Sequence, residues 1–110
     1  MTGVQTCALP ILQSVSQLPE PYRKNVQRAV EILKTAGCTD IFLFGSLVHG
    51  KIHSDTDIDL AVRGCPSGEF FHLWGKLSFE LDYPIDLISL DLQQDFGRFL
   101  AEQQELVKIV

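Results

Sequence analysis

The 110-residue sequence is poor in cations, in cysteine and in long apolar runs, and each shortage argues against a class of protein. Its 9 lysines and arginines stand against 14 acidic residues, and the net charge of −5 argues against direct binding of nucleic acid. The longest apolar runs fall far short of the ~20 residues that a membrane-spanning helix needs. Three scattered cysteines, Cys7, Cys38 and Cys65, have no metal-type spacing and predict free thiols in a cytoplasmic protein.

Several familiar catalytic motifs are also missing. The sequence contains no Walker-type Gly-Lys-Ser/Thr, no His-Glu-x-x-His and no Gly-x-Ser-x-Gly. The three histidines, His49, His53 and His72, lack the spacing of a zinc site. The length fits one domain with a modest core.

The first eleven residues differ in character from the rest. They resemble the translation of a common sequencing-adapter oligonucleotide, and they lack the basic start and sustained apolar stretch of a signal peptide. We therefore expect residues 1–20 to be an artefactual or disordered segment and residues 21–110 to form the domain.

Apolar periodicity predicts alternating helices and strands over this domain. Helical spacing covers residues 22–36, 69–81 and 92–105, and apolar or alternating runs predict strands at 41–44, 58–62, 84–90 and 106–110. Only about a dozen residues separate the first two strands, which favours an antiparallel pair. The pattern predicts an α/β (α+β) fold in which helices flank a small mixed β-sheet.

Three details of packing follow from the same periodicity. The aromatic residues of the middle helix are expected in the core: Phe70, Phe71, Trp74 and Phe79. The last helix is expected to turn Phe96, Phe99 and Leu100 inward. Asp91 is expected to cap that helix at its N-terminus.

Two carboxylates stand at the head of the second predicted strand. Asp57 and Asp59 are two residues apart, so in a strand they share a face, about 7 Å apart at Cα. Asp86 lies within the third strand between Ile85 and Leu87, where an unpaired charge would be unfavourable. Carboxylates held this close repel one another, and a hard divalent cation relieves the repulsion.

A Gly-Ser turn precedes these acids. Gly45 and Ser46 directly follow the apolar strand 41–44, and glycine lets backbone N–H groups approach a phosphate. The turn and the carboxylates together indicate a site for a metal-bound nucleoside triphosphate.

Gly-Ser, a ten-residue gap and Asp-x-Asp, with a third carboxylate on a later strand, resemble the minimal nucleotidyltransferases of the DNA polymerase beta superfamily. That resemblance implies that Asp57, Asp59 and Asp86 are catalytic and bind two Mg²⁺ ions. It also implies that Gly45 and Ser46 bind ATP, the substrate.

One position departs from the pattern. His49 stands where family members often carry arginine, and a mostly neutral histidine is a weaker phosphate ligand. Lys51 and Arg63 are candidate replacement cations.

The acceptor of the nucleotide is inferred from size. A bare catalytic module resembles the antitoxins of HEPN–MNT toxin–antitoxin pairs, which implies AMP transfer to a tyrosine of a HEPN toxin. Two alternatives stay open: an interaction module that neutralises a helical partner by binding alone, and an adenylyltransferase of small molecules. Homo-oligomerisation is also left open.

Overall fold

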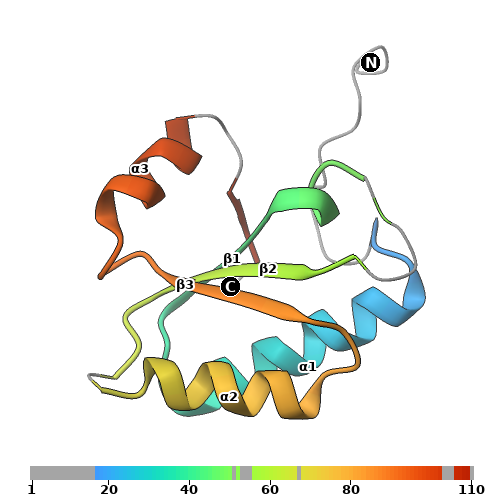
Figure 1. The fold of residues 1–110 in the computed structure, drawn as a ribbon, viewed down its shortest axis with the longest axis horizontal. Coiled ribbons are helices and arrows are strands. Elements are labelled where there is room, and N and C mark those ends of the chain that lie inside the picture. The colour runs from blue at the N-terminus through green and yellow to red at the C-terminus, as the bar shows by residue number, and fades with distance from the viewer. Residues whose placement is uncertain (1–16, 51, 53–55, 67, 103–105, 110) are drawn as a thin grey trace.

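Four strands form one mixed sheet in the part of the chain that the computed structural model describes, which is residues 17–50, 52, 56–66, 68–102 and 106–109. The strands are β1 (Asp40–Phe44), β2 (Ile58–Arg63), β3 (Ile85–Ser89) and β4 (Val107–Lys108), and their order across the sheet is β3-β2-β1-β4 (Figure 1). β1 is antiparallel to β2 and β4, whereas β2 and β3 are parallel. The predicted mixed sheet and its antiparallel first pair are confirmed.

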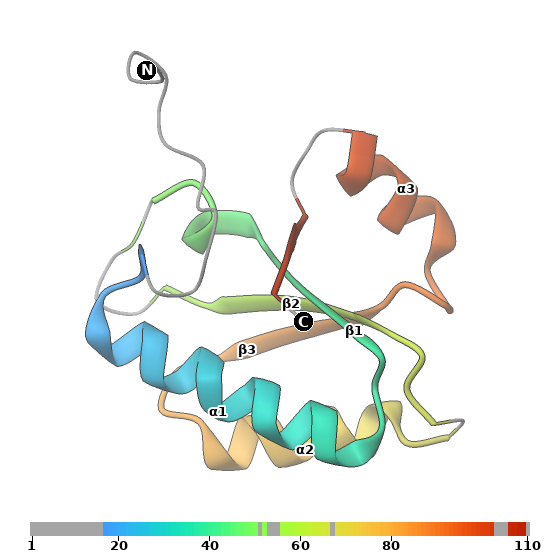
Figure 2. The ribbon, with the colours of Figure 1, turned by 180° about the vertical axis from the view of Figure 1, so that it is seen from behind.

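Helices α1 (Glu20–Ala36) and α2 (Phe70–Glu80) cover one face of the sheet and lie side by side beneath it (Figures 1 and 2). α1 ends at Gly37, whose φ of 107° allows its N–H to reach the carbonyls of Leu33 and Lys34. Val26, Ala29 and Leu33 form the buried stripe of α1. With Leu73 and Leu77 of α2 they pack on strand residues in the larger apolar cluster, as the helical spacing predicts.

The aromatic residues of α2 divide between core and solvent. Phe70 and Trp74 pack against the larger cluster, and the Trp74 Nε1–H donates to the Ile85 carbonyl at 3.0 Å. Phe71 and Phe79 are 75% and 88% exposed, so the prediction of a core position is wrong for both. They lie on the side of α2 turned away from the buried Leu73 and Leu77, where no described element covers them.

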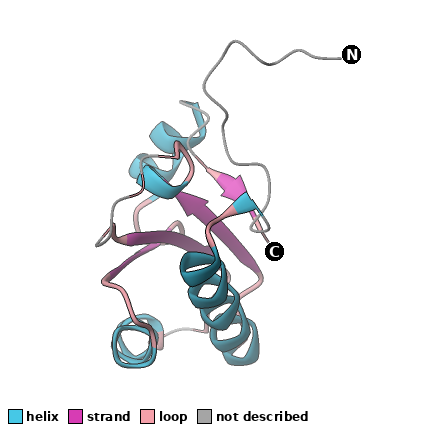
Figure 3. Cartoon of the chain, turned by 90° about the vertical axis from the view of Figure 1, so that its right-hand side faces the viewer, coloured by secondary structure: helices cyan, strands magenta, loops and turns pink. Residues whose placement is uncertain are grey.

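Helix α3 (Gln94–Glu102) lies on the opposite face of the sheet, and the side view of Figure 3 shows the strands between the two layers. A Cβ on Gly97 would collide with the Leu90 side chain, so the missing side chain lets the helix lie close to the sheet. Leu100 is buried in the smaller apolar cluster, as predicted. Phe96 and Phe99 are 42% and 54% exposed, and the inward placement predicted for them is wrong.

Asp91 does not cap α3 as predicted, because the helix begins three residues later. Its carboxylate accepts a 2.8 Å hydrogen bond from the N–H of Gly64 instead. The Ser89 hydroxyl accepts from the Leu92 N–H at 3.2 Å and supports the turn before α3.

Cys38 and Cys65 form a disulfide, so the prediction of free thiols is wrong for this pair. Cys38 follows the end of α1 and Cys65 follows β2, and the bond therefore ties the α1–β1 junction to the loop before α2. Their separation of 27 residues gives no motif that sequence reading could detect. Cys7 and the rest of the suspected adapter segment lie outside the described residues.

Reducing this disulfide should destabilise the fold measurably. Closing a loop of 27 residues restricts the unfolded chain, so reduction should lower the free energy of unfolding by about 2–4 kcal/mol. Urea denaturation with and without dithiothreitol measures this difference. The test is best done in a Cys7→Ser background, and the same background with Cys65→Ser should show no response to dithiothreitol. Equal stability of the parent with and without reductant would contradict a disulfide in solution.

No helix among the described residues is long and apolar enough to cross a membrane.

Candidate active site

Asp59 and Asp86 lie next to each other on the parallel strands β2 and β3. The strand register pairs them directly, and adjacent strands run about 4.8 Å apart. Ile58, Leu60, Ile85 and Leu87 belong to the larger cluster beneath the sheet. By alternation, both carboxylates project from the other face, the face on which α3 lies.

Asp57 precedes β2 and adds a third negative charge. It is exposed, as is Asp86, whereas Asp59 is half-buried. Burial raises the pKa of the Asp59 carboxyl to about 6, and repulsion from Asp86 and then from Asp57 adds to the rise. Asp86 is thus exposed although it lies between buried residues of β3, and both Asp86 and Asp57 act on Asp59 electrostatically.

Gly45 brings the end of β1 against the Asp59 carboxylate. Phe44, the last residue of β1, is the register partner of Asp59. Gly45 has a φ of 77°, and a Cβ there would overlap Asp59 Oδ2 and lie 3.0 Å from its Cγ. The position therefore requires glycine both for its backbone and for its space.

The turn that follows is anchored in the core. Gly45, Ser46 and Leu47 form the short 3₁₀ helix η2 (Gly45–Leu47), and Leu47 and Val48 are fully buried. η2 thus holds the Gly-Ser backbone beside Asp59, where the sequence predicts a phosphate-binding turn.

The donor set suits a hard divalent cation. Three carboxylates supply only oxygen ligands, and a cation would offset both the burial and the repulsion that raise the Asp59 pKa. Within the described ranges, no three His, Cys, Asp or Glu side chains already converge as a metal cage. Binding would therefore require the exposed Asp57 and Asp86 side chains to turn toward Asp59.

Of the candidate cations, Arg63 lies away from these acids. Arg63 lies four residues beyond Asp59 on β2, about 13 Å along the strand. It pairs with Asp40 at 3.6 Å and lies over the ring of Phe42, so the prediction that it compensates for His49 is not supported. His49 is half-buried behind η2, and Lys51 lies outside the described residues.

The raised pKa of Asp59 predicts a pH-dependent stability. The folded state binds this proton more tightly than the unfolded state, whose pKa is near 3.8, so the stabilisation is complete below about pH 4. It is lost as pH rises through about 6, and by pH 8 the free energy of unfolding should have fallen by about 1–3 kcal/mol. Urea denaturation in EDTA across this range measures the loss.

Two variants isolate the contribution of Asp59 to that curve. Asp59→Asn should remove this part of the pH dependence and should be more stable than wild type at pH 8. Asp95→Asn, which removes a fully exposed carboxylate on α3, should leave the curve parallel to wild type. Parallel curves for wild type and Asp59→Asn would show that Asp59 titrates normally.

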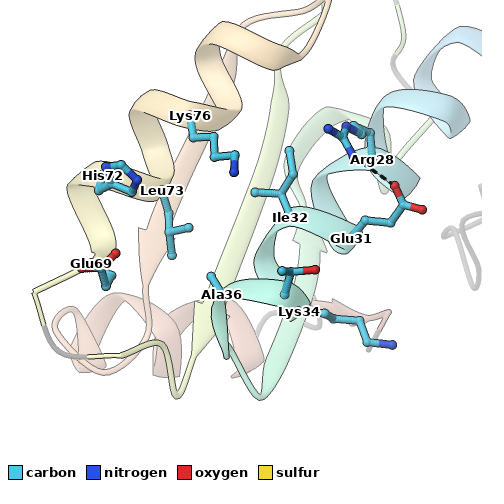
Figure 4. Close-up of a pocket in the computed structure, with 10 residues that line it drawn as sticks. Arg28, Glu31, Ile32, Lys34, Ala36, Glu69, His72, Leu73 and Lys76 are labelled. Atoms are coloured by element: carbon cyan, nitrogen blue, oxygen red, sulfur yellow. Dashed lines mark hydrogen bonds and ion pairs between the residues drawn. The ribbon is translucent and has the colours of Figure 1, made fainter.

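A separate groove lies elsewhere among the described residues. It runs between α1 and α2 on the far side of the sheet, has a volume of about 640 Å³, and has Ile32, Ala36 and Leu73 among its lining residues (Figure 4). Lys76 and Arg28 lie on its two sides, and Arg28 pairs with Glu31. None of the predicted site residues lines it, so it is separate from the carboxylate site.

Comparison with known proteins identifies a family and similar folds. The model of the family described as polymerase beta, nucleotidyltransferase, matches residues 27–108. A crystal structure of the toxin–antitoxin MntA–HepT is similar at 21% identity and a TM-score of 0.58, over 78% of this chain and 69% of that chain. A toxin–antitoxin crystal structure with AMP-PNP is similar at 24% identity and a TM-score of 0.53, over 71% and 91%. No curated protein matches the sequence significantly.

Proposed function

Because the chain belongs to the polymerase beta nucleotidyltransferase family, we propose that it transfers AMP from ATP to a tyrosine hydroxyl of a partner HEPN toxin. The observation that carries this proposal is the direct pairing of Asp59 with Asp86, with Asp57 and the Gly45 backbone beside them. The fold likeness to the MntA–HepT toxin–antitoxin supports the choice of partner.

The reaction exchanges a phosphoanhydride bond of ATP for a phosphate ester bond to the acceptor. The acceptor oxygen attacks the α-phosphorus of ATP, the bond from that phosphorus to the β-bridging oxygen breaks, and pyrophosphate leaves. The acceptor hydroxyl gives up its proton to a base. Two bound Mg²⁺ ions would neutralise the charge that develops on the attacking and leaving oxygens.

The three carboxylates divide two tasks in this proposal. Asp57 and Asp59 would hold the metal ions. Asp86 completes the metal site and orients the acceptor hydroxyl, whose proton it can accept as a general base. The backbone of Gly45 and Ser46 positions the triphosphate, because N–H groups in a tight turn bind anions.

The cytoplasm is the proposed location, because ATP is supplied there. Its thiol pool would reduce the Cys38–Cys65 disulfide, so the reduced protein is the form proposed to act there. Activity should therefore be measured with reductant present.

A second candidate is an interaction module that neutralises a partner by binding alone. His49 in place of the common arginine and the absence of a preformed metal cage among the described residues favour it. The raised pKa of Asp59 counts against it, because a binding surface gains nothing from holding repelling carboxylates beside a half-buried one.

Labelled ATP tests the proposal. The purified protein is incubated with Mg²⁺ and a candidate HEPN partner, using ATP labelled at the α- or the γ-phosphate. Label from the α-phosphate alone should appear on the partner. Label from the γ-phosphate would indicate phosphoryl transfer instead, and no label from either would favour the binding module.

A further inference from the structure

Phe96 is a large apolar side chain that stays 42% exposed beside the carboxylate site. Its ring meets that of Phe44 edge to face, with 6.4 Å between ring centroids and 81° between ring planes. Phe44 is almost fully buried and is the register partner of Asp59. Phe96 therefore contacts Phe44, the strand partner of Asp59, which is a proposed metal ligand.

The two sides of α3 face different ends of the sheet. Gln94, Arg98 and Ala101 line a hollow of about 320 Å³ together with Arg63 and Asp91, at the end of β2 remote from Asp59. Phe96 contacts Phe44 at the other end, where β1 reaches Gly45. The exposed part of its ring thus borders the carboxylate end of the sheet.

Phe96 is not the only residue of α3 that contacts the sheet. Leu100 is buried against the smaller cluster, and Gly97 allows close contact with Leu90. An edge-to-face pair joins the edge of one ring to the face of the other and leaves aromatic surface open to a further planar group. A base stacked on an aromatic side chain gains about 1–3 kcal/mol.

We propose that Phe96 stacks on the nucleobase of the triphosphate whose phosphates would bind at the Gly45 turn, next to metal ions held by the three carboxylates. The inference rests on the proposed nucleotidyl transfer and adds to it the residue that holds the base. Stacking depends on ring area and not on hydrogen bonds to particular atoms, so ATP and GTP should both use it.

Binding of two ligands with and without a base tests the assignment. The full chain is titrated by calorimetry with ATP and, separately, with inorganic tripolyphosphate, each with Mg²⁺. Phe96→Ala should weaken ATP binding about tenfold and leave tripolyphosphate binding unchanged. Phe96→Trp should restore ATP binding. Phe99→Ala is the matched control on the same helix, and it should bind both ligands like wild type.

The outcomes distinguish a failure of the stacking role from a failure of the proposed nucleotidyl transfer. Unchanged ATP binding by Phe96→Ala would overturn the stacking role. The proposed function would still stand in that case, provided that the wild-type protein binds both ligands. An equal loss of tripolyphosphate binding, or the same loss in Phe99→Ala, would also overturn it, because either would indicate a general effect on the site. Failure of wild type to bind either ligand would overturn the proposed function itself.

Discussion

Asp59→Asn should lower AMP transfer by about two to four orders of magnitude. Asparagine keeps the size of the side chain but removes the charge that would hold a metal ion between β2 and β3. The half-buried position of Asp59, next to Asp86 and behind Gly45, makes it the member of the set that no other described side chain can replace. Asp57→Asn should lower transfer in the same range, because it removes a ligand of the same ions.

The loss should come without unfolding. Removing one of several repelling charges lowers the electrostatic repulsion within the metal-free protein. Both variants should therefore melt at or above the wild-type temperature. Label transfer from α-labelled ATP measures activity, and Asp95→Asn on the exposed side of α3 is the control. Transfer near the wild-type rate by either Asp57→Asn or Asp59→Asn would contradict the assignment of the metal site.

Asp86→Ala should abolish transfer while leaving binding to the partner toxin intact. Metal and general-base contributions lost together should lower the rate by about two to four orders of magnitude. Asp86 is exposed on its strand, whereas its neighbours Ile85 and Leu87 are buried on the other face. The strand should therefore tolerate alanine, and pull-down of the partner should match wild type.

This variant separates an enzyme from a binding module. If the protein silences its partner by AMP transfer, Asp86→Ala should bind the partner and fail to silence its ribonuclease activity. Full silencing by Asp86→Ala, together with no label transfer by wild type, would establish the interaction-module alternative.

The carboxylate face could be predicted from the sequence because strand alternation is a local rule. Apolar residues on either side of Asp59 and of Asp86 specify which face each strand buries, and the acids then lie on the other. The structure adds the register that makes the two direct neighbours. It also adds the contact of Gly45 with Asp59, which depends on how β1 and β2 pair and which no spacing in the sequence reveals.

The residues whose burial or pairing was predicted wrongly are those whose surroundings depend on long-range packing. Helical periodicity identified Leu73 and Leu77 correctly, but it cannot show that nothing packs on Phe71 and Phe79. α3 turns Gly97 and Leu100 inward, which leaves Phe99 exposed. Cys38 and Cys65 meet only because α1 and β2 end close together, which is a property of the whole fold.

The mass of the intact partner toxin tests the central claim most directly. The toxin is incubated with ATP, Mg²⁺, reductant and either wild-type protein or Asp59→Asn, and its mass is then measured. We predict that wild type adds the mass of one or more AMP groups and that these map to tyrosine, while Asp59→Asn adds none. An unchanged toxin mass with wild-type protein, under conditions in which the two proteins form a complex, would contradict the account.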